Sequence, residues 1–169
     1  MYFDGTTGTG LIVSTSSAVA LGYANFTVEM WMYPLTSYNN GNAPALLDAR
    51  TTGNGAGLIR FGFNGTTLAA GPQIAWIENV TTLLTATVIL NVWQHIAVVR
   101  NSGVLTMYNN GTAISSIANS VDLIVPFKYI GKSYNNLPFN GYIDDLRITN
   151  GIARYTTAFI PPIQKLQLK

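Results

Sequence analysis

Short segments in which apolar and polar residues alternate run along the whole chain, and Gly, Asn, Thr and Ser separate them every several positions. This pattern predicts many short strands, because successive side chains of a strand point to opposite faces and turn residues end the pairing. The clearest case is residues 26–33, where the even-numbered positions are apolar and the odd-numbered ones include Glu29 and Trp31. Both faces of this segment carry large side chains, as in a strand inside a sandwich of two sheets.

Further strands follow from the same signals. Residues 93–100 are apolar at their centre and β-branched toward their end, which indicates a central buried strand. Asn109-Asn110-Gly111 predicts a hairpin between residues 104–108 and 112–118, because Asn-Gly tolerates the positive φ angles of a tight turn. A second hairpin is expected to turn at Asn64-Gly65, after residues 58–63. The remaining expected strands are residues 10–13, 45–49, 73–78, 84–89, 127–130 and 141–149. The fold class is therefore all-β, with two antiparallel sheets.

No charge run, Pro-rich tract or long low-complexity segment divides the 169 residues. A chain of this length can bury one sizeable core, so residues 1–169 are expected to form a single domain. The chain has no cysteine, which excludes disulfides, thiolate metal sites and a cysteine nucleophile.

Charged residues make up only 9% of the chain, against about 25% in an average soluble domain. This shortage predicts that neighbouring subunits cover part of the surface. The nine basic residues are scattered and the net charge is only +2, so no nucleic-acid partner is expected. No apolar run approaches the roughly 20 residues of a membrane span, and no signal peptide opens the chain, so membrane insertion is not expected either.

Few residues are suited to catalysis. The single histidine, His95, lies in an apolar segment and is expected to be a packed, hydrogen-bonded core residue. Glu29 is a lone carboxylate on its strand face, whereas glycosidases typically need a pair. Asp144 and Asp145 are adjacent and point to opposite faces of a strand. Two roles are open for them: a structural role near Arg147 or a backbone turn, or ligation of calcium by either residue together with backbone oxygens of another loop. No catalytic, cofactor-binding or metal-binding residues are therefore assigned, and the protein is not expected to be an enzyme.

A sugar site is the remaining candidate. Aromatic rings stack on pyranose faces and amides bond hydroxyl groups, although the same residue types also occupy ordinary loops and oligomer interfaces. Residues 37–40 and 133–136 both read Ser-Tyr-Asn-Asn. The expected glycan or partner contacts are Tyr38, Asn39, Trp76, Tyr134 and Asn135.

Several of these segments, taken in order, resemble the laminin-G-like domains of the concanavalin A-like lectin and glucanase superfamily, in the form common in bacteriophage structural proteins. The matching segments are residues 2–5, 26–34, 93–100, 105–111, 141–148, 151–155 and 159–162. The resemblance implies a jelly-roll sandwich in which the N-terminal strand lies beside residues 141–149. The resemblance does not imply an enzymatic activity, because the Glu-x-Asp-x-x-Glu motif of the glucanase branch is absent from the sequence.

These observations predict two alternative functions, one structural and one in ligand binding. In the first, the chain is a phage virion structural protein that is made in the host cytoplasm and decorates or cements the capsid as a homo-oligomer, with a trimer favoured. The fold begins at Met1 and leaves no room for an anchoring stalk, so attachment through the domain's own surface is expected. In the alternative, the domain is a lectin-like adhesion module, at a fibre tip or on the virion surface, that recognises cell-surface glycans.

Overall fold

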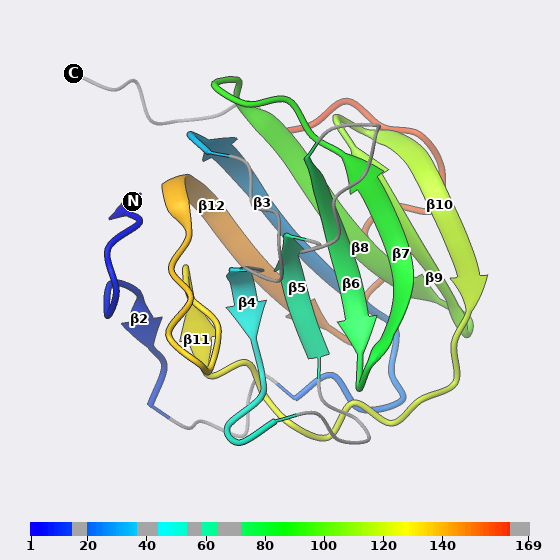
Figure 1. Ribbon diagram of the computed structural model, residues 1–169. Helices are drawn as coiled ribbons and strands as arrows, with labels where there is room; N and C mark the ends of the chain where they lie inside the picture. Colours follow the sequence, from blue (N-terminus) through cyan, green and yellow to red (C-terminus); the bar gives the residue numbers. More distant parts are fainter. Residues whose placement is uncertain (15–19, 37–43, 54–58, 64–71, 163–169) are drawn as a thin grey trace.

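The computed structural model describes residues 1–14, 20–36, 44–53, 59–63 and 72–162. In these residues two six-stranded antiparallel sheets pack face to face, which confirms the predicted concanavalin A-like sandwich (Figure 1). Sheet 1 has the order β1 (Tyr2–Asp4), β12 (Asn140–Asn150), β3 (Phe26–Pro34), β8 (Gln94–Asn101), β9 (Val104–Asn109) and β10 (Thr112–Ala118). Sheet 2 has the order β2 (Leu11–Ile12), β11 (Tyr129–Ile130), β4 (Ala45–Asp48), β5 (Ile59–Phe63), β6 (Gln73–Glu78) and β7 (Thr81–Thr87).

The core lies between the two sheets, and it is formed by the alternate apolar side chains that the sequence predicted to point inward. On β3 the even-numbered side chains, Phe26 to Met32, are fully buried in it. The indole of Trp76 on β6 meets them from the other sheet, stacked on the Phe26 ring at 5.7 Å between ring centres. Burial of this apolar area is the main term that stabilises the sandwich.

Residues that adopt positive φ angles form the hairpin turns. Asn110 and Gly111 adopt φ angles of 48° and 78°, which confirms the predicted turn between β9 and β10. The β5–β6 pair is also antiparallel as expected, whereas its predicted turn at Asn64-Gly65 lies outside the described residues. β7 begins at Thr81, earlier than the predicted residue 84, because Asn79 takes a φ of 56° and closes a tight turn directly after β6.

The N-terminal strand β1 pairs with β12, as the family resemblance implied. The chain after β12 then crosses the outer face of sheet 1, the face turned away from sheet 2. There Tyr155 and Phe159 stack at 3.5 Å and pack against a small apolar cluster formed by Ala97, Val99 and Tyr108. The outer face of sheet 1 is thus partly covered by the chain itself.

Candidate functional site

The outer face of sheet 2 brings polar side chains from three strands into one row. Tyr129 of β11 lies opposite Asp48 of β4, and Asp48 lies opposite Arg60 of β5. On β11 the neighbouring Ile130 packs against the core, so Tyr129 points outward. An aromatic ring, a carboxylate and a guanidinium are therefore next to one another on this face.

Asp48 organises the residues around it, although its side chain is fully buried. Its Oδ1 accepts hydrogen bonds from the backbone N–H and the Nε of Arg50, both at 2.9 Å, and its Oδ2 accepts from Nη2 of Arg50 at 2.7 Å. The backbone N–H of Tyr134 donates to the same Oδ2 at 3.0 Å. The Arg50 guanidinium consequently lies over the Tyr134 ring, 4.7 Å from its centre. One carboxylate thus fixes a cation and an aromatic ring together.

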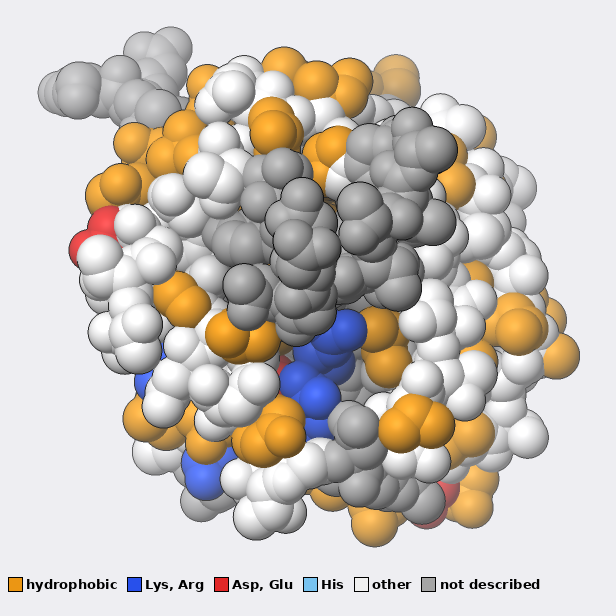
Figure 2. Space-filling model, in the orientation of Figure 1, with side chains coloured by type: hydrophobic (Ala, Val, Ile, Leu, Met, Phe, Trp, Pro, Cys, Tyr) orange, Lys and Arg blue, Asp and Glu red, His pale blue; other side chains and the backbone are white. Residues whose placement is uncertain are grey.

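Four of the nine basic residues belong to this region: Arg50, Arg60, Lys128 and Lys132. Burial, and to a smaller extent the charge of the nearby Arg50, lower the pKa of the Arg60 guanidinium to about 10, and Asp48 offsets only part of this decrease. The Nζ atoms of Lys128 and Lys132 each lie 5.6 Å from the centre of the Tyr129 ring. Lys and Arg side chains gather in a hollow near the middle of this face (Figure 2). We call this region, with its four cations, the basic hollow.

Two of the sequence-predicted contact residues lie at the basic hollow. Tyr134 is half-buried beneath Arg50, and the next residue, Asn135, is exposed. The Ser133 hydroxyl donates to Oδ1 of Asn135 at 2.5 Å and accepts from the backbone N–H of Leu137 at 3.1 Å, which holds the loop after β11 in place. Tyr38 and Asn39 lie outside the described residues.

The structure corrects the prediction that Trp76 contacts a ligand or partner, because it places this residue in the core. Its indole is 0% exposed, packs against Phe26, Phe61 and Phe127, and donates from Nε1 to Oε1 of Glu78 at 3.0 Å. A ring without free surface cannot stack on a sugar. The period of two along residues 73–78 places Trp76 on one face with the apolar Ile74, and this signal marks it as a core residue.

The sequence reading did not select the cations of the basic hollow. Asp48 and Arg60 stand out only as charged residues within otherwise apolar strands, a pattern that marks either a structural pair or a site. Lys128 and Lys132 flank a two-residue strand with no motif of their own. Their proximity arises from strand pairing between segments far apart in the sequence.

Glu29 and His95 lie on the outer face of sheet 1 and form a separate polar cluster. The Glu29 carboxylate, 1% exposed, lies 3.2 Å from Nε2 of His95, and it accepts from Nε of Arg147 at 2.8 Å and from the Tyr155 hydroxyl at 2.6 Å. Nε of Arg154 is 3.2 Å away. Burial by itself raises the pKa of Glu29, but the hydrogen bonds from His95, Arg147 and Tyr155 outweigh it and lower the pKa to about 2. His95 is buried and paired, which confirms its predicted structural role.

Glu29 therefore fastens the segment after β12 to sheet 1, because Arg154 and Tyr155 belong to that segment. Its carboxylate is buried and has four basic or hydroxyl groups within 3.2 Å. We call this cluster the Glu29 lock, because it holds the segment after β12 against sheet 1.

Asp144 and Asp145 lie at a bulge of β12, where the pairing with β3 is interrupted and Asp145 takes a φ of 47°. The Asp145 N–H donates to Oδ1 of Asp144 at 2.9 Å. Within the described part of the chain, no three His, Asp or Glu residues come together as metal ligands would. The described residues also contain no helix long and apolar enough to span a membrane.

Comparison with solved structures finds the same fold in several other proteins. A sialidase CBM40 from Ruminococcus gnavus, bound to α2,3-sialyllactose, has a TM-score of 0.65 and 15% identity, with 92% of each chain covered. Domain 4 of the arabinanase AbnA from Geobacillus stearothermophilus, in complex with arabinotriose, has a TM-score of 0.57 and 18% identity, covering 90% of this chain and 75% of that one. A heptameric SAP-like pentraxin from Limulus polyphemus has a TM-score of 0.61 and 14% identity, covering 87% and 73%. At these identities the likeness shows the fold alone.

Comparison with curated proteins finds no match. The sequence does match a family, Laminin_G_3, over residues 5–154, which is most of the chain. With this match and the two six-stranded sheets, the chain belongs to the Laminin_G_3 family of the concanavalin A-like lectin/glucanases superfamily.

Proposed function

We propose that this domain is a non-catalytic glycan-binding module that holds an acidic sugar in the basic hollow. The observation that carries the proposal is the pair formed by Arg50 and Tyr134, which stands beside the exposed amide of Asn135. A half-buried aromatic ring offers a pyranose a stacking face, and an amide bonds its hydroxyl groups. The Arg50 guanidinium, whose Nε and Nη2 bond Asp48, adds a positive charge beside the ring that attracts an anionic group.

The charge of the hollow supports an acidic ligand. Arg50 and Arg60 lie near one carboxylate, Asp48, which is already bonded to Arg50, and Lys128 and Lys132 add two cations at the neighbouring Tyr129 ring. The residual positive potential attracts anionic groups and is partly screened by salt. Sialyllactose, which the Ruminococcus gnavus CBM40 binds, carries such a carboxylate.

Two features support a binding role without catalysis. The Asp48 carboxylate is occupied by Arg50 and by the N–H of Tyr134. Glu29 is held on the opposite sheet by four donors. Glycoside hydrolysis typically needs two available carboxylates, and both of these acids are already engaged by donors of the protein. Incubation with sialyllactose is therefore expected to leave the sugar intact.

The test is calorimetric titration with 3′-sialyllactose and, as the matched neutral sugar, lactose. We expect sialyllactose to bind more tightly and its affinity to fall as NaCl rises, because the attraction is electrostatic. Arg50→Ala and Tyr134→Ala are expected to weaken binding, whereas Arg154→Ala, which removes a cation from the other sheet, is the control. Equal affinity for both sugars would refute the acidic-ligand proposal, and no binding of either would refute the glycan role at this site.

A virion structural role is the second candidate, and exposed apolar side chains favour it. Ile114 and Ile117 on β10 are 48% and 39% exposed, and Ile160 is 93% exposed, in a chain with 9% charged residues. Such side chains suit contacts between subunits of a homo-oligomer or with a capsid. Light scattering of the purified chain tests the assembly: a trimer mass that falls to the monomer mass in the Ile114→Ser, Ile117→Ser variant is expected, and a monomeric parent chain would contradict it.

A further inference from the structure

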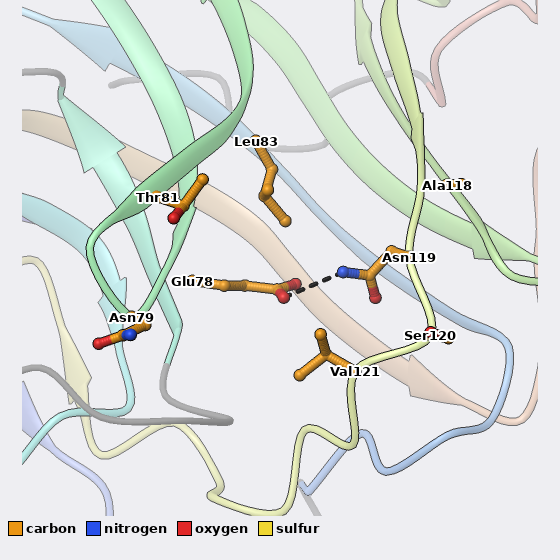
Figure 3. A pocket seen from close by; sticks show the side chains of 8 residues that line it. All are labelled: Glu78, Asn79, Thr81, Leu83, Ala118, Asn119, Ser120 and Val121. Carbon is orange, nitrogen blue, oxygen red and sulfur yellow. Dashed lines mark hydrogen bonds between the residues drawn. The ribbon is translucent and has the colours of Figure 1, made fainter.

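A second concave site lies at the β7 edge of sheet 2, away from the basic hollow. It is a cleft between the turn that joins β6 to β7 and the segment that follows β10 (Figure 3). Its volume of about 420 Å³ falls within the range of ligand pockets, about 300–1,000 Å³. The cleft is lined by Glu78, Asn79, Thr81, Leu83, Ala118, Asn119, Ser120 and Val121.

The floor of the cleft is a carboxylate joined to an amide. Glu78 and Asn119 are each 6% exposed, and Nδ2 of Asn119 donates to Oε2 of Glu78 at 3.0 Å, the bond drawn in Figure 3. Oε1 of Glu78 accepts from Nε1 of Trp76 at 3.0 Å. A carboxylate has about four acceptor positions, so two protein donors leave capacity for a ligand. The polar atoms of the floor are accordingly ready to accept hydrogen bonds.

Arg100 holds this floor in place through hydrogen bonds. Its guanidinium, 1% exposed, donates from Nη1 to Oδ1 of Asn119 at 3.2 Å and to the Val121 carbonyl at 2.8 Å. It also donates to the carbonyls of Ala24 and Gly22. These bonds fix Asn119, and Asn119 together with Trp76 fixes Glu78. The floor is thus rigid before any ligand arrives, a condition that lowers the entropic cost of binding.

The cleft has the opposite charge preference from the basic hollow. In the described part of the chain no Lys, Arg or His nitrogen lies within 4.0 Å of the Glu78 carboxylate. Arg100 is close enough to interact with Glu78, but its donors are directed to Asn119 and to carbonyl oxygens. The side chains of Leu83 and Val121 stand on either side of the floor as apolar walls (Figure 3). An acceptor-rich floor between apolar walls suits a compact ring that carries hydrogen-bond donors and a positive charge.

We infer that this cleft is a second, independent ligand site, which takes a small amino sugar with its ammonium group on the Glu78 carboxylate. The ammonium supplies three donors and a charge that matches Glu78. The ring packs between Leu83 and Val121, and its hydroxyl groups reach Thr81 and Ser120 at the rim. The inference does not depend on the proposed role of the basic hollow, because the two sites share no residue.

The test is an NMR titration with three pyranoses of similar size: D-glucosamine, D-glucose and D-glucuronate. We expect D-glucosamine to shift the methyl signals of Leu83 and Val121 at the lowest concentration, D-glucose to do so more weakly, and D-glucuronate to leave them unchanged. The Nε–H signal of Arg50 reports on the basic hollow in the same spectra, where D-glucuronate is expected to act instead. Unchanged Leu83 and Val121 signals with D-glucosamine, or an equal response to D-glucuronate, would overturn the inference.

Variants separate this site from the fold and from the basic hollow. Val121→Phe fills the cleft without touching the Glu78 hydrogen bonds and is expected to weaken D-glucosamine binding by roughly tenfold or more. Ile124→Phe is the control, since Ile124 is 63% exposed and does not line the cleft. Glu78→Gln is expected to abolish the preference for D-glucosamine over D-glucose; should its fold be lost, Val121→Phe decides. Arg50→Ala is expected to leave D-glucosamine binding unchanged, so that a failure of one site is distinguishable from a failure of the other.

Discussion

The guanidinium of Arg50 lies 4.7 Å above the ring of Tyr134, and the buried carboxylate of Asp48 bonds both residues. Arg50 follows β4 and Tyr134 follows β11, and these two strands are neighbours in sheet 2. The pairing of β4 with β11 therefore builds the candidate site, because it joins two loops that are far apart in the chain.

Arg50→Lys tests whether geometry or charge alone matters at this pair. Lysine keeps the charge but loses the planar fork that bonds both Asp48 oxygens and stacks on the ring. We expect affinity for 3′-sialyllactose to fall by roughly tenfold, although the net charge is unchanged. Isothermal titration measures the change. Lys128→Arg is the matched control, and an Arg50→Lys variant with parent affinity would show that the pair is not the contact.

Stability is expected to depend on pH through Glu29. Its pKa in the folded state is about 2, below the ordinary 4.5, so the carboxylate stabilises the fold above pH 4.5. This contribution, about 3 kcal/mol from the difference between the two pKa values, is lost as the pH falls from 4.5 toward 2. Urea unfolding across this range measures it. The Glu29→Gln variant is expected to be less stable at pH 7, and its unfolding free energy should change less with pH. An unchanged pH dependence would contradict the stabilising role of the Glu29 lock.

Trp76→Ala is expected to affect the core and not the basic hollow. Removing an indole that is fully buried among Phe26, Phe61 and Phe127 leaves a cavity and costs about 3–5 kcal/mol of unfolding free energy. Chemical unfolding gives the loss, and titration of the folded fraction with 3′-sialyllactose should give the parent affinity. Phe61→Ala, at an equally buried position, is the control and should behave in the same way.

Gly131→Ala is expected to destabilise the edge where the N-terminal strand docks. Gly131 has a φ of +73°, and a Cβ there would lie 2.1 Å from the Phe3 ring. Backbone strain and displacement of Phe3 together should cost about 1–3 kcal/mol. Gly8→Ala is the matched control, since its φ is +95° but nothing lies within 4 Å of the new Cβ. Equal losses in both variants, measured by thermal unfolding, would show that the Phe3 contact is unimportant.

The candidate site was only partly predictable. Tyr134 and Asn135 were selected by residue type, because aromatic and amide side chains in a loop suit sugar contact. The same reasoning selected Trp76, which the structure buries, because residue type does not say which face of a strand a ring occupies. Arg50 carries no local signal, Arg60 is marked only as a charge within an otherwise apolar strand, and the scattered basic residues form no stripe in the sequence. Their common position depends on the pairing of β4, β5 and β11.

Sequence patterns alone predict the all-β class, the inward face of β3 and the turn at Asn110-Gly111. These features depend on neighbouring residues, through the period of two along a strand and the φ angles that Asn and Gly tolerate. The folded structure was needed to show which loops meet at Asp48, which residues bond Glu29, and how Glu78 and Asn119 form the floor of a cleft. Each of these contacts joins distant segments, and their positions follow from sheet pairing and packing rather than from any local pattern.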